Sequence, residues 1–63
     1  MATTVRDILQ LLRDDGWIQV SQKGSHRQFK HAVKSGRVTV SGKPNSIPPK
    51  GTLNSILKQA GLN

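Results

Sequence analysis

The stretch TVRDILQLLRDDGWIQVSQ, residues 4–22, decides the fold because the spacing of its apolar residues changes at Gly16. Before this glycine, apolar side chains recur at i, i+3, i+4 and i+7 behind a T-x-x-D capping signal, which predicts an amphipathic helix over residues 4–15. From Trp17 to about Gln22, apolar and polar residues alternate, which predicts a half-buried strand. The chain is therefore expected to combine helix and sheet.

The rest of the chain supplies two more strands and a second helix. Turn residues mark strands at about residues 26–32 and 37–41. All three prolines fall within residues 42–51, so this segment is expected to be a loop. Thr52 is expected to cap the second helix. The apolar stripe of that helix consists of Leu53, Ile56, Leu57 and Ala60. The predicted fold class is α+β, in the order α-β-β-β-α, with two helices on one face of a three-stranded antiparallel sheet.

Alternation along the strands is expected to separate a covered face of the sheet from an open one. The side chains expected to face inward are Ile18, Val20, Phe29, Val38 and Val40. Those expected to face outward are Trp17, Gln19, Ser21, His26, Gln28, Lys30, Arg37, Thr39 and Ser41. A bulge would shift this register by one residue. Trp17 has two interpretations, a platform on which unpaired bases stack or a ring folded over the edge of the core, and we favour the second.

The balance of charges indicates a polyanionic partner such as nucleic acid. Ten lysines and arginines stand against three acidic residues, a net charge of +7 on 63 residues. A chain of this length is expected to form a single domain, residues 1–63. It has no cysteine, and no apolar run approaches the roughly 18 residues needed to span a bilayer. We expect a cytoplasmic protein that does not associate with membranes.

Few catalytic options are open to this chain. All three aspartates lie in the first predicted helix, and two histidines without cysteine do not make a three-ligand metal site by any usual spacing. We therefore expect no metal ion and no cofactor. His26 remains, because an imidazole on a basic sheet can pass a proton to or from RNA, which carries its own 2′-hydroxyl nucleophile. Gly24 allows a tight backbone bend towards a phosphate, and Ser25 adds a hydroxyl donor.

The chain resembles the HicA-type toxins, the small RNA-cleaving partners of HicB antitoxins in bacterial and archaeal toxin–antitoxin pairs. The resemblance covers nearly the whole length. Its most distinctive carriers are Gly24-Ser25-His26 at the strand turn, Gly51-Thr52-Leu53, and the sequence ILKQAG near the end. In full, the carriers are residues 5–12, 15–17, 23–31, 38–40 and 51–62.

The resemblance implies a fold similar to the double-stranded RNA-binding domain and ribosome-independent cleavage of mRNA. It also implies that the histidine of the glycine-serine-histidine motif, which His26 alone matches, is the catalytic residue. His31 matches a second histidine with a structural or substrate-positioning role. Many relatives carry proline and histidine after the third strand, whereas this chain has the sequence SGKP at residues 41–44. Lys43 is then the nearest cation.

The leading hypothesis is the toxin of a type II toxin–antitoxin pair, a metal-independent endoribonuclease with His26 as its catalytic residue. A HicB-like antitoxin is expected to neutralise it by covering the open sheet. The residues expected to contact RNA are Lys23, Gly24, Ser25, Arg27, Gln28, Lys30 and Lys43. The alternatives are a non-catalytic RNA-binding module of the same fold and a family member that serves only to bind a partner.

Overall fold

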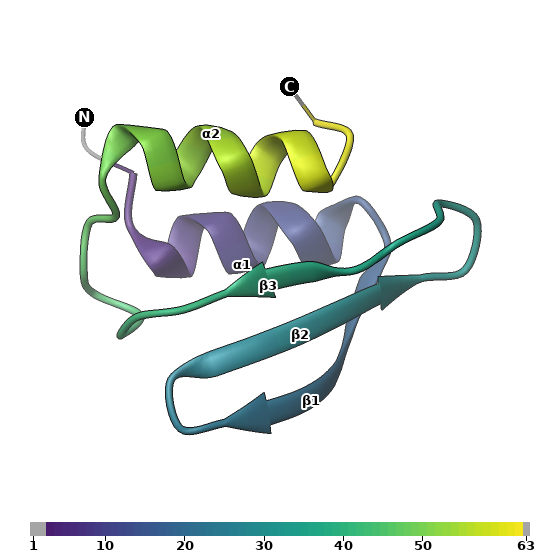
Figure 1. Ribbon diagram of the computed structural model, residues 1–63, viewed down its shortest axis with the longest axis horizontal. Coiled ribbons are helices and arrows are strands. Elements are labelled where there is room, and N and C mark those ends of the chain that lie inside the picture. The colour runs from purple at the N-terminus through teal and green to yellow at the C-terminus, as the bar shows by residue number, and fades with distance from the viewer. Residues whose placement is uncertain (1–2, 63) are drawn as a thin grey trace.

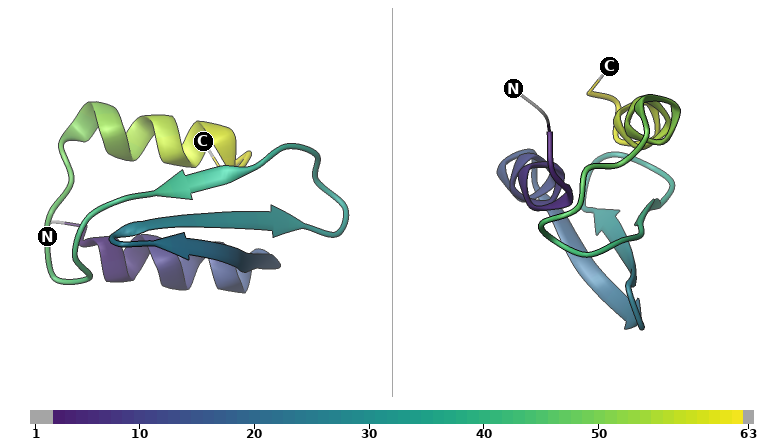
Figure 2. Two further views of the ribbon diagram at one scale, coloured as in Figure 1. Left: turned by 60° about the horizontal axis from the view of Figure 1, so that its bottom comes forward. Right: turned by 90° about the vertical axis from the view of Figure 1, so that its left-hand side faces the viewer.

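Two helices pack on one face of a three-stranded antiparallel sheet in the computed structural model, which describes residues 3–62 (Figure 1). The elements are α1 (Val5–Asp14), β1 (Trp17–Lys23), β2 (His26–His31), β3 (Val38–Val40) and α2 (Lys50–Gln59). The strands pair in chain order, and Figure 2 shows both helices on the same side of the sheet. The predicted α+β fold and its element order are confirmed. Within residues 3–62, no helix has the length and apolar character needed to cross a membrane.

The first helix begins where the sequence predicts, and the proline-rich loop completes its first turn. The Thr4 hydroxyl accepts a hydrogen bond from the Asp7 amide at 3.2 Å, and the Asp7 carboxylate accepts one from the Thr4 amide at 2.9 Å. The first two amides of α1 donate to the carbonyls of Ser46 and Pro44, each at 2.9 Å. The loop thereby satisfies backbone donors that the start of a helix leaves without partners.

The second helix begins three residues earlier than predicted. It starts at Lys50, with Pro49 at the N-cap position and no side-chain cap, so the prediction that Thr52 caps this helix was wrong. Pro49 has φ −56° and ψ 151°, and its carbonyl accepts a hydrogen bond from the Leu53 amide at 3.0 Å. Because the proline ring fixes φ near this value, the extended backbone of an N-cap is already set, and the helix starts without a hydroxyl cap.

The core lies between the helices and the covered face of the sheet. Trp17 and Phe29, the two aromatic residues of the chain, are almost fully buried in it. The other buried side chains are Val5, Ile8, Leu9, Leu12, Val38, Val40, Ile56 and Ala60. Trp17 therefore belongs to the core and is not a base-stacking platform.

The first half of β1 faces the opposite way from the predicted parity. Ile18 and Val20, expected inside, are 64% and 51% exposed. Trp17 and Gln19, expected outside, lie on the covered face, where Gln19 pairs directly with Phe29. The register shifts at Val20, so the residues that follow return to their predicted faces. The indole offers more apolar area than an isoleucine side chain, and the shifted register is the one that buries it.

Asp15, which directly follows α1, joins several parts of the chain. Its carboxylate accepts a hydrogen bond from the Trp17 indole at 3.2 Å and forms an ion pair with the Lys34 ammonium. Its backbone carbonyl lies 2.6 Å from the His31 ring. Lys34 also donates to the carbonyl of Ala60, at the end of α2, at 3.0 Å. These bonds connect the end of α1 to β1, to the loop after β2 and to the end of α2.

Asp15→Asn is expected to make the protein less sensitive to acid. The hydrogen bond from Lys34, aided by the ammonium charge and the Trp17 indole, holds the pKa of Asp15 below its ordinary value of 3.8. The unfolded chain therefore binds more protons than the folded protein in acid. The stability from this carboxylate is complete above the ordinary pKa and is lost as the pH falls through the lower, folded-state pKa.

Urea unfolding at about pH 7 and about pH 3 measures this difference. Asp15→Asn should be less stable than the wild type at neutral pH and should lose less additional stability on acidification. Some acid sensitivity remains, because the Thr4 amide lowers the pKa of Asp7 in the same way. Asp14→Asn is the matched control, since the Asp14 carboxylate accepts only from the exposed Gln10 side chain. If Asp15→Asn lost as much stability on acidification as the wild type, the Asp15 carboxylate would not be a source of the acid sensitivity.

Candidate functional site

A two-residue turn at Gly24 and Ser25 joins β1 to β2 and fixes the position of His26. Gly24 has φ +60° and Ser25 has a negative φ, the pattern of a type II′ turn, whose twist matches that of the flanking strands. Lys23 and His26 consequently form the last residue pair of the hairpin. The side chains of such a pair share one face of the sheet, with Cβ atoms about 5 Å apart.

His26 lies on the open face of the sheet, as the alternation predicts. It is exposed, and it points away from the core because the next residue, Arg27, pairs with the buried Val40 on the covered face. Within residues 3–62, no hydrogen bond occupies either of its ring nitrogens. Lys23, across the hairpin, and Lys30, four residues along β2, are exposed on the same face. The structure thus places an unengaged imidazole beside cations.

Gln28 and Arg37 extend this polar surface along the sheet. The Arg37 guanidinium donates to the side-chain oxygen of Gln28 at 2.8 Å, and Gln28 pairs with Thr39 on the open face. The alternation assigns Arg37 to this face, but no motif includes it, so no role for it was predicted from the sequence. Its hydrogen bond adds a positioned guanidinium to the face that carries Lys23.

His31, the second histidine, is held in a different environment. Its Nδ1 accepts hydrogen bonds from the amides of Val33 and Lys34, both at 3.0 Å, which leaves the ring proton on Nε2. Nε2 then donates to the carbonyl of Asp15, and the ring packs edge-on against Trp17 with centroids 5.2 Å apart. Both nitrogens of His31 are therefore used to hold the fold together.

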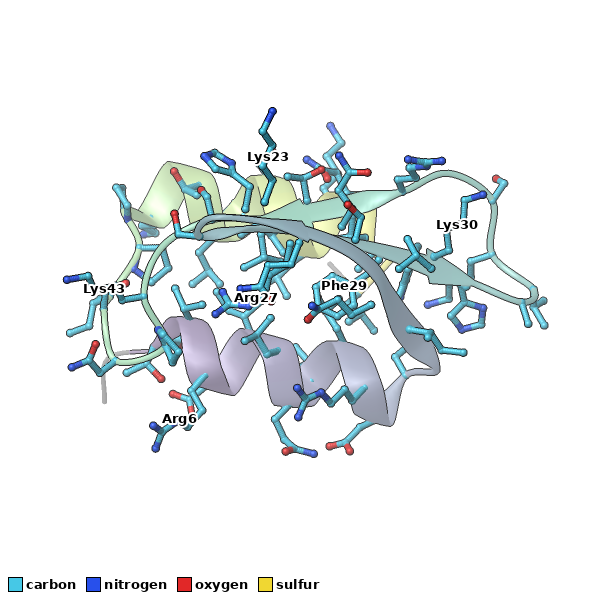
Figure 3. All side chains as sticks on the ribbon, turned by 90° about the horizontal axis from the view of Figure 1, so that it is seen from below. Arg6, Lys23, Arg27, Phe29, Lys30 and Lys43 are labelled. Carbon is cyan, nitrogen blue, oxygen red and sulfur yellow. The ribbon has the colours of Figure 1, made fainter. Side chains whose placement is uncertain are left out.

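Arg27 does not share the face of its neighbour His26. It is half-buried and donates to the carbonyl of Gly42, in the loop after β3, at 3.2 Å. Figure 3 shows its side chain directed towards α1, whereas Lys23 points away from α1. The end of the hairpin therefore carries Lys23 on the open face and Arg27 on the covered face. The sequence motif did not show that these two cations lie on opposite faces.

Lys43 lies in the loop beyond β3, and its side chain is exposed. Its carbonyl accepts hydrogen bonds from the amide and the hydroxyl of Ser46, at 3.0 and 2.7 Å. Among the described residues, no three side chains of the His, Cys, Asp and Glu types gather into a group that could hold a metal ion. The site is thus built from the β1–β2 hairpin and the exposed cations around it.

Gly24→Ala is expected to destabilise the protein by about 1–2 kcal/mol, the cost of a left-handed backbone for a residue with a Cβ atom. A Cβ at Gly24 meets nothing within 4 Å, so the cost is one of backbone conformation and not of a clash. Gly24→Asn should cost markedly less, because asparagine tolerates positive φ. Urea unfolding compares the two variants, and equal losses would show that the turn conformation is not what Gly24 supplies.

Two comparisons with known proteins bear on the family of the chain. A search of curated proteins gave no significant match. A family model described as the HicA toxin of bacterial toxin–antitoxin systems matches residues 5–62, which is nearly the whole chain and includes both helices and all three strands. The chain belongs to the HicA toxin family.

Proposed function

We propose that this toxin is an endoribonuclease that cleaves mRNA with His26 as its catalytic residue and without a metal ion. The observation that carries the proposal is the contrast between the two histidines. His31 has both ring nitrogens engaged, whereas His26 is exposed, has no hydrogen-bond partner among the described residues and lies across the hairpin from Lys23. An unengaged imidazole on a cationic surface is available to exchange a proton with bound RNA.

RNA supplies the nucleophile for the proposed reaction. The 2′-oxygen forms a bond to the adjacent phosphorus and releases its proton. The bond from phosphorus to the 5′-oxygen breaks, and the 5′-oxygen takes up a proton. The products are a 2′,3′-cyclic phosphate and a 5′-hydroxyl, so atoms and charges balance with no other reactant. His26 carries one of the two protons, and solvent carries the other.

The cations of the open face stabilise the negative charge that develops on the phosphorane. Lys23 is closest to His26 in the strand pairing, while Lys30 and Arg37 lie farther along the same face. Of these cations, Arg37 is held in place by Gln28 before the reaction begins, and a positioned charge of this kind lowers the barrier. At the turn, the backbone amides near Gly24 and the hydroxyl of Ser25 are donors for the phosphate oxygens.

The same face is the proposed docking surface for a HicB-like antitoxin. Membership of a toxin–antitoxin family implies an antitoxin partner. The net charge of +7 favours an acidic partner surface, and a protein seated over the hairpin would cover His26 and exclude RNA. An antitoxin that covers this face would neutralise the toxin without changing its conformation.

Inducible expression in bacteria tests the proposal. The wild-type chain should arrest growth and produce cleaved mRNA, and His26→Ala should do neither at the same protein level. Co-expression of the product of the adjacent reading frame should restore growth to cells that carry the wild type. Growth arrest and RNA cleavage by the alanine variant would end the assignment, and a chain that binds RNA but cleaves none in either form would be a non-catalytic RNA-binding module.

A further inference from the structure

A groove on the opposite face of the β1–β2 hairpin from His26 gathers three of the four arginines of the chain. It lies between α1 and the hairpin and has a volume of about 470 Å³. Arg6 and Arg13 reach it from α1, and Arg27 reaches it from β2. The polar lining is completed by Gln10, Gln19 and Gln22.

Helix periodicity and strand register together assemble this groove. Arg6, Gln10 and Arg13 are spaced i, i+4 and i+7, so they project from one face of α1. Gln22 pairs directly with Arg27, which places both on the covered face of the sheet, near the end of the hairpin. The apolar core ends before this point, and the space that it leaves between α1 and the hairpin is lined with polar side chains.

Among the described residues, no carboxylate lines the groove to offset its positive charge. The one ion pair among residues 3–62 joins Lys34 to Asp15. Asp7 is held by the cap of α1 and does not line the groove, although the nearby charge of Arg6 contributes to lowering its pKa. Asp14 accepts a hydrogen bond from Gln10 at 3.0 Å but does not itself line the groove. These are all the acidic side chains of the chain, so the three guanidinium groups face the groove without a carboxylate among its lining residues.

We propose that this groove binds a second, single-stranded stretch of the RNA substrate, which passes around the hairpin from the scissile phosphate at His26. The inference rests on the proposed function and extends it from the cleavage site to the substrate. Guanidinium groups bind phosphate oxygens through paired hydrogen bonds, and glutamine amides carry the donors and acceptors that recognise base edges. Arg27 is already oriented by its bond to the Gly42 carbonyl.

The shape and lining of the groove favour single-stranded RNA over the alternatives. A hollow of about 470 Å³ has the size of a small-molecule site and admits nucleotides of one strand, whereas a duplex is far too wide to enter. A protein partner would be expected to find a cluster of apolar or aromatic side chains at the centre of its site. Here the apolar lining consists of Leu9, which is almost fully buried, and Pro44.

Binding of a labelled single-stranded RNA oligonucleotide at several salt concentrations tests this proposal. The measurements use full-length His26→Ala, which keeps the groove but does not cut the probe. Adding Arg6→Gln and Arg13→Gln should weaken binding at least tenfold at low salt. It should also reduce the slope of log K against log salt by about 1.4, because each lost phosphate contact on a single strand counts about 0.7. The matched control is Lys50→Gln with Lys58→Gln, which removes the same charge from α2 and should change the slope by less than about 0.5.

Cleavage kinetics separate this inference from the proposed function. With His26 intact, the Arg6 and Arg13 double variant should raise KM while kcat at saturating RNA stays within about twofold of the wild type. Circular dichroism confirms that each variant is folded. An unchanged salt slope would overturn the groove proposal, whether or not His26→Ala abolishes cleavage. Loss of affinity for an acidic protein in the double variant, with RNA binding unchanged, would also overturn it. Cleavage that survives His26→Ala would overturn the proposed function and leave the binding result to stand alone.

Discussion

His26→Ala is expected to slow RNA cleavage by the purified protein about 10²- to 10⁴-fold, the contribution of a positioned general acid or base. The remaining rate would come from RNA binding and from the cations of the open face, which the substitution leaves in place. Single-turnover cleavage of a labelled RNA, with protein in excess, measures the chemical step separately from product release. Because the ring is exposed and has no hydrogen-bond partner within residues 3–62, the free energy of unfolding should change by less than about 0.5 kcal/mol.

His31→Ala is the matched control, because it should show the opposite pattern. Its ring accepts two backbone amides and donates to the Asp15 carbonyl, so its loss leaves polar groups unpaired and should cost about 1–3 kcal/mol of stability. At a temperature where this variant is still folded, it should cleave RNA at close to the wild-type rate. A folded His31→Ala that is inactive beside a fully active His26→Ala would reverse the assignment of the two histidines.

Trp17→Ala is expected to lower the free energy of unfolding by about 3–5 kcal/mol, as for other large-to-small substitutions in a packed core. The indole is only 2% exposed, packs against His31 and donates to the Asp15 carboxylate. A chain of 63 residues has a total stability of about 3–9 kcal/mol at 0.05–0.15 kcal/mol per residue, so the variant should be largely unfolded or close to it. Circular dichroism and urea unfolding measure the loss, and toxicity should fall with the folded fraction.

Ile18→Ala is the control that tests the register of β1. The Ile18 side chain is 64% exposed on the open face, so its truncation should cost less than about 1 kcal/mol. The predicted alternation, in which Ile18 is inside and Trp17 is outside, gives the reverse order of losses. A larger loss for Ile18→Ala than for Trp17→Ala would therefore show that β1 is turned over relative to the structure described above.

The element order was predictable because it depends on local patterns. Thr4 and Asp7 form the capping box that the T-x-x-D signal predicts, and the change of apolar spacing at Gly16 falls between α1 and β1. The two-residue turn at Gly24 was visible as a glycine followed by serine between two alternating stretches. Each of these features is decided by residues that are close together in the sequence.

The departures depend on contacts that a local pattern does not contain. Alternation in β1 is broken at Val20, because burying Trp17 against the end of α1 requires the opposite parity from burying Ile18. The start of α2 is set by the backbone of Pro49, while the sequence offered the hydroxyl of Thr52 as a more familiar cap. In both cases the conformation predicted from the local sequence differs from the one that contacts with the rest of the chain stabilise.

The candidate site was predictable only in part for the same reason. The glycine-serine-histidine motif identified His26, and alternation placed it on the open face. The motif also grouped Arg27 with His26, although consecutive residues of a strand point to opposite faces. The i, i+4, i+7 spacing of Arg6 and Arg13 around Gln10 was present in the sequence, but its meaning depends on how closely α1 approaches the hairpin, which the structure shows.

If His26 assists attack by the 2′-hydroxyl of the RNA itself, the chemical ends of the cleavage products must show it. The purified wild-type protein is incubated in EDTA with an RNA of known sequence, and with the same RNA carrying a single 2′-deoxynucleotide at the cleavage position. We expect fragments that end in a 2′,3′-cyclic phosphate and begin with a 5′-hydroxyl, and no cut at the deoxynucleotide. Fragments with a 3′-hydroxyl and a 5′-phosphate, or undiminished cleavage at the deoxynucleotide, would contradict this expectation.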